Sequence, residues 1–299
     1  MWSFMPILNS KNNRLGALYL VGEIAATFLL ASIVKILQPG FSIFIILFFR
    51  YLFCLPLLVA YAIYTRGQDF LSIKNIRGLI LRTGFGFMGL LMWFLAISKI
   101  DISLATALLM TMPIFITGLS IIIAKEQVCV KRLASVLLGF FGVLVLLFPI
   151  NPELNLWGAV FALLGSLFAA LMFVYLRILG RSDPSVSTAI YYNSMGLILA
   201  GIITGILGGF EPIINLSNPN PMYMFIAFGV LASFQQFFLA QSHFHAEAST
   251  LAPLHYLSIP FGVGVGIIFF GEIITVKFLI GTTIIIASTF YIFLGDRSK

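Results

Sequence analysis

Long apolar runs alternate with short polar segments along almost the whole chain. A bilayer core about 30 Å thick requires roughly 20 apolar residues in a helix, because each residue advances the helix by about 1.5 Å. Ten runs meet this requirement: Leu15–Leu37, Phe41–Tyr64, Leu79–Ser98, Ile102–Ala124, Arg132–Pro149, Leu156–Ile178, Ser187–Gly209, Met222–Gln241, Ala248–Phe270 and Ile274–Leu294. The pattern therefore predicts an all-α membrane protein with ten transmembrane helices.

The basic residues fall mainly in the loops on one side of these predicted spans. That side, which includes both termini, holds thirteen of them: Lys11, Arg14, Arg66, Lys74, Arg77, Arg82, Lys125, Lys131, Arg132, Arg177, Arg181, Arg297 and Lys299. The opposite side holds three, each close to a helix end: Lys35, Lys99 and Lys277. Short loops rich in lysine and arginine remain in the cytoplasm. We therefore expect both termini to be cytoplasmic.

The two halves of the chain share short matching segments in the same order. The matches stand 142, 144 and 146 residues apart: Gly16-Ala17 with Gly158-Ala159, Lys35-Ile36-Leu37 with Arg177-Ile178-Leu179, Phe94–Ser98 with Phe238–Ser242, and Glu126 and Lys131 with Glu272 and Lys277. Two apolar sequences also align by chance, but chance matches would not keep this order. We expect two repeats, residues 10–150 and 151–299, with five helices each. An odd number of helices inverts the second repeat, and many secondary transporters bind substrate between repeats related in this way.

The composition disfavours several classes of protein. Hydrophobic residues make up 61% of the 299 residues and charged residues 9%, and the mean hydropathy is +1.10. A soluble domain has about 25% charged residues, so this chain has too few to cover a water-facing surface. A soluble enzyme, a disordered protein and a nucleic-acid binder are therefore disfavoured. The net charge of +7 fits basic cytoplasmic loops. Two cysteines, Cys54 and Cys129, cannot form a disulfide framework.

Several short motifs occur in order along the spans. Phe49-Arg50-Tyr51 lies in the second span, and Pro113 in the fourth is followed thirteen residues later by Glu126. The later motifs are Gly139-Phe140-Phe141-Gly142 and Phe270-Gly271-Glu272. Together they resemble the EamA-type transporters, the ten-helix branch of the drug/metabolite transporter superfamily, over residues 16–294. Residues 252–257 are similar to the start of the ninth helix in that family, although His255 stands where a glutamine is expected.

Within that family the chain is most similar to the S-adenosylmethionine uptake group, through residues 48–50, 136–142, 252–253 and 256–257. The resemblance implies a secondary transporter that moves a small zwitterionic or cationic metabolite by alternating access. Export of aromatic amino acids is the alternative, and a channel or an intramembrane enzyme is a more distant one. We expect a bacterial inner-membrane protein, a monomer or a homodimer, whose partners are the lipid bilayer, a small-molecule substrate and a proton as coupling ion.

Two ionisable residues lie deep within predicted spans: Glu23 in the first and Arg50 in the second. Charged groups at this depth are costly unless they are paired or face water, so they are candidates for function. Glu23 can bind an ammonium or sulfonium group, or a proton. Arg50 can bind a carboxylate, which a guanidinium holds through two hydrogen bonds. The alternative is that the two residues neutralise each other and hold two helices together.

Six further residues are candidate substrate-binding positions within the spans. They offer aromatic, hydroxyl, amide and imidazole groups: Trp93, Thr111, Tyr192, Gln236, His255 and Tyr256. Thr111 lies near Pro113, which frees a backbone carbonyl because proline has no N–H. His255 can also titrate during proton coupling. For each of the six, packing or hydrogen bonding within the bundle is the alternative.

No cofactor or metal site is expected. Gly84–Gly89 matches a dinucleotide fingerprint, but it lies within an apolar span with no preceding strand, and close helix packing explains its glycines. His243, His245 and Glu247 lie close in sequence, but no further ligand cluster supports a metal site. Neither a catalytic constellation nor the ring of like residues that a channel requires is apparent. The sequence therefore predicts a transporter that is not an enzyme.

Overall fold

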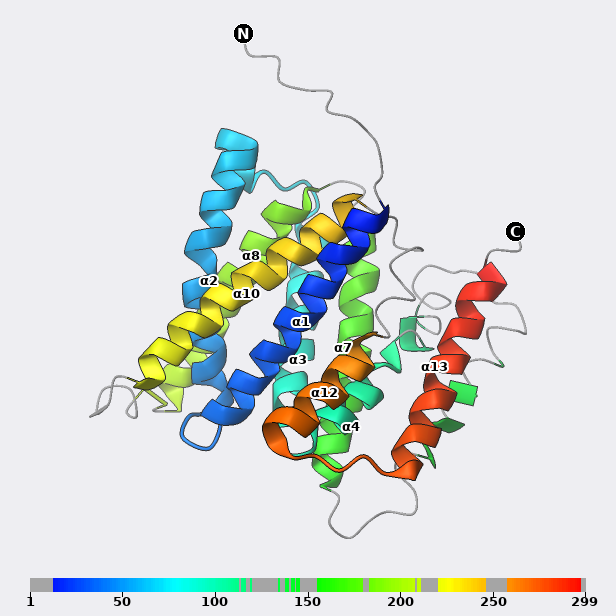
Figure 1. Cartoon of the computed structure of the whole chain (residues 1–299). Coiled ribbons are helices and arrows are strands. Elements are labelled where there is room, and N and C mark those ends of the chain that lie inside the picture. Colours follow the sequence, from blue (N-terminus) through cyan, green and yellow to red (C-terminus); the bar gives the residue numbers. More distant parts are fainter. Residues whose placement is uncertain are drawn as a thin grey trace.

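The computed structural model describes residues 13–112, 114–116, 119, 134, 138–139, 141–142, 144–145, 155–179, 183–207, 209–210, 220–245 and 257–296 (Figure 1). In these ranges the regular structure is helical and contains no strand. The helices are α1 (Asn13–Leu37), α2 (Ile43–Arg66), η1 (Gly67–Leu71), α3 (Ile76–Ile97), α4 (Ile102–Leu109), α7 (Leu156–Leu179), α8 (Ser185–Ile206), α10 (Asn220–His245), α12 (Ser258–Phe270) and α13 (Val276–Asp296). The predicted all-α class is confirmed for the described residues.

Six helices in the described part of the chain are long and apolar enough to cross a membrane: α1, α2, α3, α7, α8 and α10. Three shorter apolar helices cover Ile102–Ile116, Ser258–Phe270 and Val276–Ser288. The predicted fifth span, Arg132–Pro149, lies mostly outside the described residues. A total of ten transmembrane helices therefore remains a prediction.

Polar side chains and glycines mark the ends of several helices. Ser42 Oγ accepts a hydrogen bond from the backbone N–H of Ile45 at 3.4 Å at the start of α2. Asn75 Oδ1 accepts one from the N–H of Gly78 at 2.9 Å at the start of α3. These bonds satisfy N–H groups that have no partner within the helix. Gly271 follows α12 with φ 64°, a left-handed conformation that glycine adopts at little cost.

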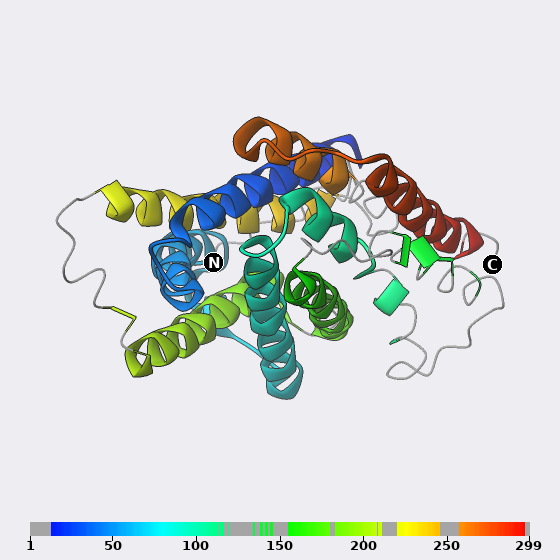
Figure 2. The ribbon, with the colours of Figure 1, turned by 90° about the horizontal axis from the view of Figure 1, so that it is seen from below.

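The helices pack in pairs that join the two halves of the chain. α3 lies along α7, α1 along α10 and α2 along α8, and α4 contacts α12. Figure 2 shows α1, α10 and α12 on one side of the bundle and α3, α7 and α8 on the other. Exchanging α1 with α7, α2 with α8, α3 with α10 and α4 with α12 maps these four contacts onto one another. Two related halves would pack in this way.

Glycines allow close packing of α3 against α7 and of α10 against α2. A Cβ atom on Gly89 of α3 would lie 3.2 Å from the backbone nitrogen of Ala169 in α7. A Cβ atom on Gly229 of α10 would overlap Phe53 Cβ in α2 and lie 3.0 Å from the Phe53 backbone, which is closer than van der Waals contact. Small residues at helix crossings let backbones approach, which is a main source of stability inside a membrane.

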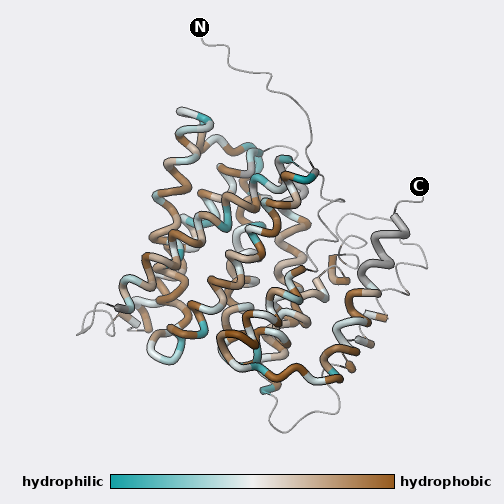
Figure 3. The backbone as a smooth tube through the Cα atoms, viewed as in Figure 1, coloured by the Kyte–Doolittle hydropathy of each residue, from teal (hydrophilic) through white to brown (hydrophobic). Residues whose placement is uncertain are grey.

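The outward faces of the bundle carry large apolar side chains. Leu18, Ile206 and Ile268 are 68%, 78% and 76% exposed, and apolar residues run along every described helix (Figure 3). In a bilayer these side chains contact acyl chains, while the helices satisfy their own backbone groups. The surface is therefore that of a membrane protein.

The first described helix begins and the last ends at the same end of the bundle. We call this the upper end, at the top of Figure 1, and the opposite one the lower end. α1 ends and α2 begins at the lower end, and α3 begins at the upper end. Placing both termini on the cytoplasmic side stays a prediction.

Candidate functional site

The carboxylate of Glu23 is buried within α1 and is held by neutral donors. The residue is 9% exposed. Gln235 Nε2 of α10 donates a hydrogen bond to Glu23 Oε1 at 2.7 Å, and Thr27 Oγ1 donates one to the same oxygen at 2.9 Å. No cation of the described residues pairs with this carboxylate. Glu23 is therefore a buried carboxylate with no counter-charge among the described residues.

The amide of Gln235 is the other polar group at this position. Its Nε2 donates the hydrogen bond to Glu23, while its Oε1 is buried without a hydrogen-bond partner among the described residues. The substrate-binding position predicted from the sequence is the next residue, Gln236; both glutamines are partly buried. Adjacent helical positions differ in direction by about 100°, so only Gln235 reaches Glu23. Together Glu23 and Gln235 offer acceptor oxygens to a ligand that carries N–H groups or a positive charge.

An aromatic cluster lies about one helical turn from Glu23. Tyr19, four residues before Glu23, has its ring centroid 6.1 Å from that of Phe237 and 6.2 Å from that of Phe238. The His245 ring stacks on Tyr19 at 5.7 Å. Residues four apart share a helix face, so the cluster and the carboxylate lie on the same side of α1. Aromatic faces attract cations, which suits a ligand with a positive group or a flat ring.

Two tyrosines meet between α2 and α8. The hydroxyl oxygens of Tyr51 and Tyr192 lie 3.2 Å apart, and the Tyr192 hydroxyl donates to the Gly86 carbonyl at 3.4 Å. Both residues are buried. A Cβ atom on Gly196 would lie 2.6 Å from Tyr51 Cζ, and one on Gly86 would lie 2.9 Å from a ring carbon of Tyr192. The glycines therefore make room for the tyrosine pair.

Two buried arginines lie against these tyrosines. Arg50 is 3% exposed and Arg82 is 6% exposed. The Arg50 Cζ lies 5.2 Å from the Tyr51 ring centroid, and the Arg82 Cζ lies 4.5 Å from the Tyr192 ring centroid. Arg82 Nη1 also donates to the Thr188 carbonyl at 3.4 Å. No ion pair joins either guanidinium to a carboxylate in the described ranges, so the predicted alternative of a Glu23–Arg50 pair is not formed.

Arg82 is buried more deeply than a loop residue. The charge pattern groups it with the basic residues of one side of the membrane, although it lies inside the predicted span Leu79–Ser98. In the structure it lies in the second turn of α3 with its guanidinium buried over Tyr192. The sequence signal for this burial is the position of Arg82 within an apolar stretch.

Thr111 and Trp93 both make contacts within the protein. The Thr111 hydroxyl donates to the Leu108 carbonyl at 2.7 Å and lies 2.9 Å from Ser166 Oγ of α7. Ser166 Oγ in turn donates to the Leu109 carbonyl at 3.1 Å. Proline at position 113 has no N–H to offer that carbonyl, so Ser166 supplies the missing donor. Trp93 is buried in α3 where α7 crosses it.

Two candidate residues lie outside the described part of the chain. His255 and Tyr256 belong to the segment between α10 and α12 that lies outside the described residues, as does Glu247. His243 belongs to α10, but its side chain lies outside the described part of the chain. The described residues contain no group of three or more His, Cys, Asp or Glu residues suited to a metal ion.

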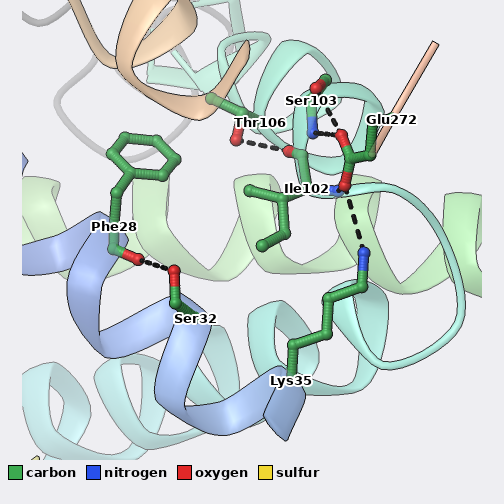
Figure 4. Close-up of polar contacts among 7 residues, drawn as sticks. All are labelled: Phe28, Ser32, Lys35, Ile102, Ser103, Thr106 and Glu272. Carbon is green, nitrogen blue, oxygen red and sulfur yellow. Dashed lines mark hydrogen bonds and ion pairs between the residues drawn. The ribbon is translucent and has the colours of Figure 1, made fainter. Parts of the chain in front are cut away.

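A second buried acid, Glu272, connects three parts of the lower end (Figure 4). It follows α12 and accepts hydrogen bonds from the backbone N–H of Ile102 at 2.7 Å, from the N–H of Ser103 at 3.0 Å, and from the Ser103 hydroxyl. Lys35 Nζ of α1 lies 3.1 Å from Glu272 Oε1. Glu272 thus caps α4 and holds α1 beside it. In the sequence Glu272 stands out as part of a family motif and as a match between the two repeats, but neither pattern predicts this contact.

The electrostatics of the lower end follow from this arrangement. Burial opposes ionisation of Glu272, but the bonds from Ser103, Ile102 and Lys35 outweigh it and lower its pKa. Burial raises the pKa of the neighbouring Asp101, and the Glu272 carboxylate raises it further while Lys35 opposes the change. An acceptor at the start of a helix also interacts favourably with the helix dipole. Glu272 is therefore a compensated charge, unlike Glu23.

The model of the EamA-like transporter family matches residues 14–148 and again residues 156–294. A solved structure described as a crystal structure of a protein matches with a TM-score of 0.63 at 16% identity, over 93% of this chain and 96% of that one. At this identity the match supports the fold alone.

Curated relatives cover most of the chain at low identity. An uncharacterized transporter of Helicobacter pylori is 25% identical over 271 residues, 87% of this chain and 88% of the relative. An S-adenosylmethionine uptake transporter of Rickettsia prowazekii is 23% identical over 277 residues, 89% of this chain and 87% of the relative. A riboflavin transporter of Brucella anthropi is 25% identical over 267 residues, 87% of this chain and 90% of the relative. All three relatives are named as transporters.

Proposed function

The chain belongs to the EamA-like transporter family, and we propose that it is a secondary transporter of a small zwitterionic or cationic metabolite, such as S-adenosylmethionine or an amino acid. It works by alternating access in the bacterial cell membrane. Two inverted five-helix repeats, residues 10–150 and 151–299, move relative to each other about a substrate site between them. The proton is the proposed coupling ion.

The observation that carries this proposal is the buried carboxylate of Glu23. Neutral donors from Gln235 and Thr27 hold it, and no cation of the described residues neutralises it. A buried carboxylate without a counter-charge is costly, so a cationic group of the substrate, or a proton, is the natural partner. The aromatic cluster at Tyr19 lies on the same helix face and favours a sulfonium or ammonium group.

A negative group on the substrate would meet a positive residue in the same bundle. Arg50 lies in α2, buried and without a carboxylate partner in the described residues. A zwitterion such as an amino acid or S-adenosylmethionine carries both charges. The relatives named for S-adenosylmethionine uptake support this substrate class. Further proposed substrate-binding positions are Trp93, Thr111, Tyr192, Gln236, His255 and Tyr256.

A second candidate is a flat aromatic metabolite without a required positive charge, such as an aromatic amino acid or a flavin. The rings of Tyr19, Phe237 and Phe238 favour it, and several relatives are named riboflavin transporters. In this case Glu23 serves the proton and not the substrate. The two candidates differ in whether Glu23 is needed for binding.

The test uses the purified protein and the isosteric variant Glu23→Gln. Thermal unfolding is followed with S-adenosylmethionine, phenylalanine, an aliphatic amino acid and riboflavin, since a ligand at about 100 times its Kd adds about 2.7 kcal/mol of stability. Uptake into proteoliposomes is then measured for the ligand that shifts the transition. Asp69→Asn is the matched control, because it removes an exposed carboxylate of η1.

For a cationic substrate, Glu23→Gln is expected to abolish the ligand-induced shift and to reduce uptake, while Asp69→Asn leaves both unchanged. A preserved shift with lost stimulation by a pH gradient would assign Glu23 to the proton. Unchanged binding and unchanged uptake in Glu23→Gln would remove Glu23 from the site and overturn the proposal.

A further inference from the structure

Two buried arginines flank the Tyr51–Tyr192 pair and come from opposite ends of the bundle. Arg50 is the eighth residue of α2, which begins at the lower end, and Arg82 is the seventh residue of α3, which begins at the upper end. At about 1.5 Å per residue, each Cα lies roughly 10 Å from the start of its helix. The tyrosine rings between them have centroids 5.8 Å apart.

The tyrosine hydroxyls are hydrogen-bonded, whereas several guanidinium N–H groups have no partner in the described part of the chain. The Tyr192 hydroxyl donates a hydrogen bond to the Gly86 carbonyl and accepts one from the Tyr51 hydroxyl. Arg50 Nε and Nη1 and Arg82 Nε are buried and have no hydrogen-bond partner among the described residues. Arg82 keeps one long bond to the Thr188 carbonyl. The free N–H groups at this place therefore belong to the two arginines.

The tyrosine rings alone do not explain why two guanidiniums are buried here. A cation over a ring is attracted to it, but this attraction replaces only part of the hydration that each guanidinium has lost. Buried arginines are normally paired with an anion. The anion missing from the described residues is therefore expected on a ligand. Two N–H groups of a planar guanidinium fit one carboxylate.

We propose that Arg82 is a second binding position for the substrate carboxylate, on the upper side of the Tyr51–Tyr192 pair, with Arg50 as the position on the lower side. The carboxylate passes from one guanidinium to the other as the site opens to the opposite end. This inference rests on the proposed transport of a zwitterion and deepens it by assigning Arg82, a residue outside the predicted site.

Paired probes test the assignment. S-adenosylmethionine and its decarboxylated form share the sulfonium and the adenosyl group and differ in the carboxylate. Uptake of both into proteoliposomes is measured for the wild type, Arg82→Gln, Arg82→Lys and the control Arg77→Gln, an exposed arginine of the same helix. Phenylalanine and phenethylamine serve as the second pair.

Arg82→Gln is expected to raise KM for the carboxylated probe by about tenfold or more, and to leave KM for the decarboxylated probe unchanged. Arg82→Lys keeps the charge but loses the bidentate geometry, so its KM for the carboxylated probe is expected to lie between those of the wild type and Arg82→Gln. Arg77→Gln matches the wild type. Equal losses for both probes, or no loss for either, would overturn the assignment. Absence of uptake of every probe by the wild type would instead refute the proposed function.

The stability of the ligand-free protein gives an independent readout. If Arg82 awaits an anion, Arg82→Gln removes an uncompensated buried charge, and the unfolding temperature stays the same or rises. If Arg82 is a structural support for Tyr192, the unfolding temperature falls. A clear fall in Arg82→Gln that Arg82→Lys restores, together with unchanged probe discrimination, would contradict the assignment.

Discussion

Glu272→Gln is expected to destabilise the folded protein by about 1.5–5 kcal/mol. A glutamine amide presents one acceptor where the carboxylate presents two, so a buried N–H of Ile102 or Ser103 is left unpaired, at about 1–3 kcal/mol. Loss of the negative charge at the start of α4 adds about 0.3–1 kcal/mol. Loss of the ion pair with the partly exposed Lys35 adds about 0.2–1 kcal/mol.

The assay follows thermal unfolding through the thiol of Cys54, which is fully buried in α2. A thiol-reactive fluorophore labels it as the helices separate, in a background where Cys129 is replaced by serine. Asp101→Asn is the matched control, because Asp101 precedes α4 and makes no side-chain capping bond. Its charge is disfavoured by burial and by Glu272, which raise its pKa. Asp101→Asn is therefore expected to leave stability unchanged or slightly higher.

The dependence of stability on pH tests the contribution of the Glu272 charge. The folded pKa of Glu272 lies below its value in the unfolded chain, so its stabilisation is complete above the unfolded pKa, about 4.3 for glutamate, and is lost as pH falls through the folded pKa. The difference in unfolding temperature between the wild type and Glu272→Gln should be constant near neutral pH and shrink in acid. A difference that widens in acid, or a Glu272→Gln protein as stable as Asp101→Asn, would refute the reasoning.

Two further substitutions test packing and the Glu23 contact. Gly229→Ala forces a Cβ against the backbone and side chain of Phe53 and should cost about 1–3 kcal/mol of unfolding free energy, whereas Gly84→Ala, with open space around it, should stabilise by up to about 1 kcal/mol; both are measured by the same thermal assay. Gln235→Leu should reduce uptake of the transported metabolite strongly, because it removes the donor to Glu23, whereas Gln236→Leu, one position along α10, should reduce it less. Equal effects of the two glutamine substitutions would place the α10 contact elsewhere.

Apolar length predicted most of the described helices closely. The predicted span Leu156–Ile178 corresponds to α7 (Leu156–Leu179), and Phe41–Tyr64 corresponds to α2 (Ile43–Arg66). Length works here because the bilayer imposes it on every span. The fourth predicted span differs, since α4 ends at Leu109 and a turn follows at Met110 and Thr111. Proline at position 113 cannot bond the Leu109 carbonyl, which lets the helix break there.

The sequence does not predict how each helix is rotated about its own axis, and this limits prediction of the site. α10 is apolar on all sides and shows no polar stripe, so nothing indicated whether Gln235 or Gln236 faces α1. The same problem hid Arg82, whose burial depends on Tyr192, a residue 110 positions away on α8. Which face of a helix meets a neighbour is decided by tertiary packing. The candidate residues could be chosen from their chemistry, but their partners required the fold.

The buried charges fall into two groups that differ in how they are compensated. Glu272 has three hydrogen bonds and an ion pair, all within the protein, so it needs no ligand and serves stability. Glu23, Arg50 and Arg82 lie within the helices with neutral partners or unpaired N–H groups. They do not neutralise one another in the described structure. A zwitterion brings one positive and one negative group, and it therefore offers a partner to both signs without adding net charge to the membrane interior. A purely cationic ligand would leave both arginines unpaired, and a purely anionic one would leave Glu23 unpaired. The pattern of compensation thus favours a zwitterionic substrate, and it does so independently of the names of the relatives.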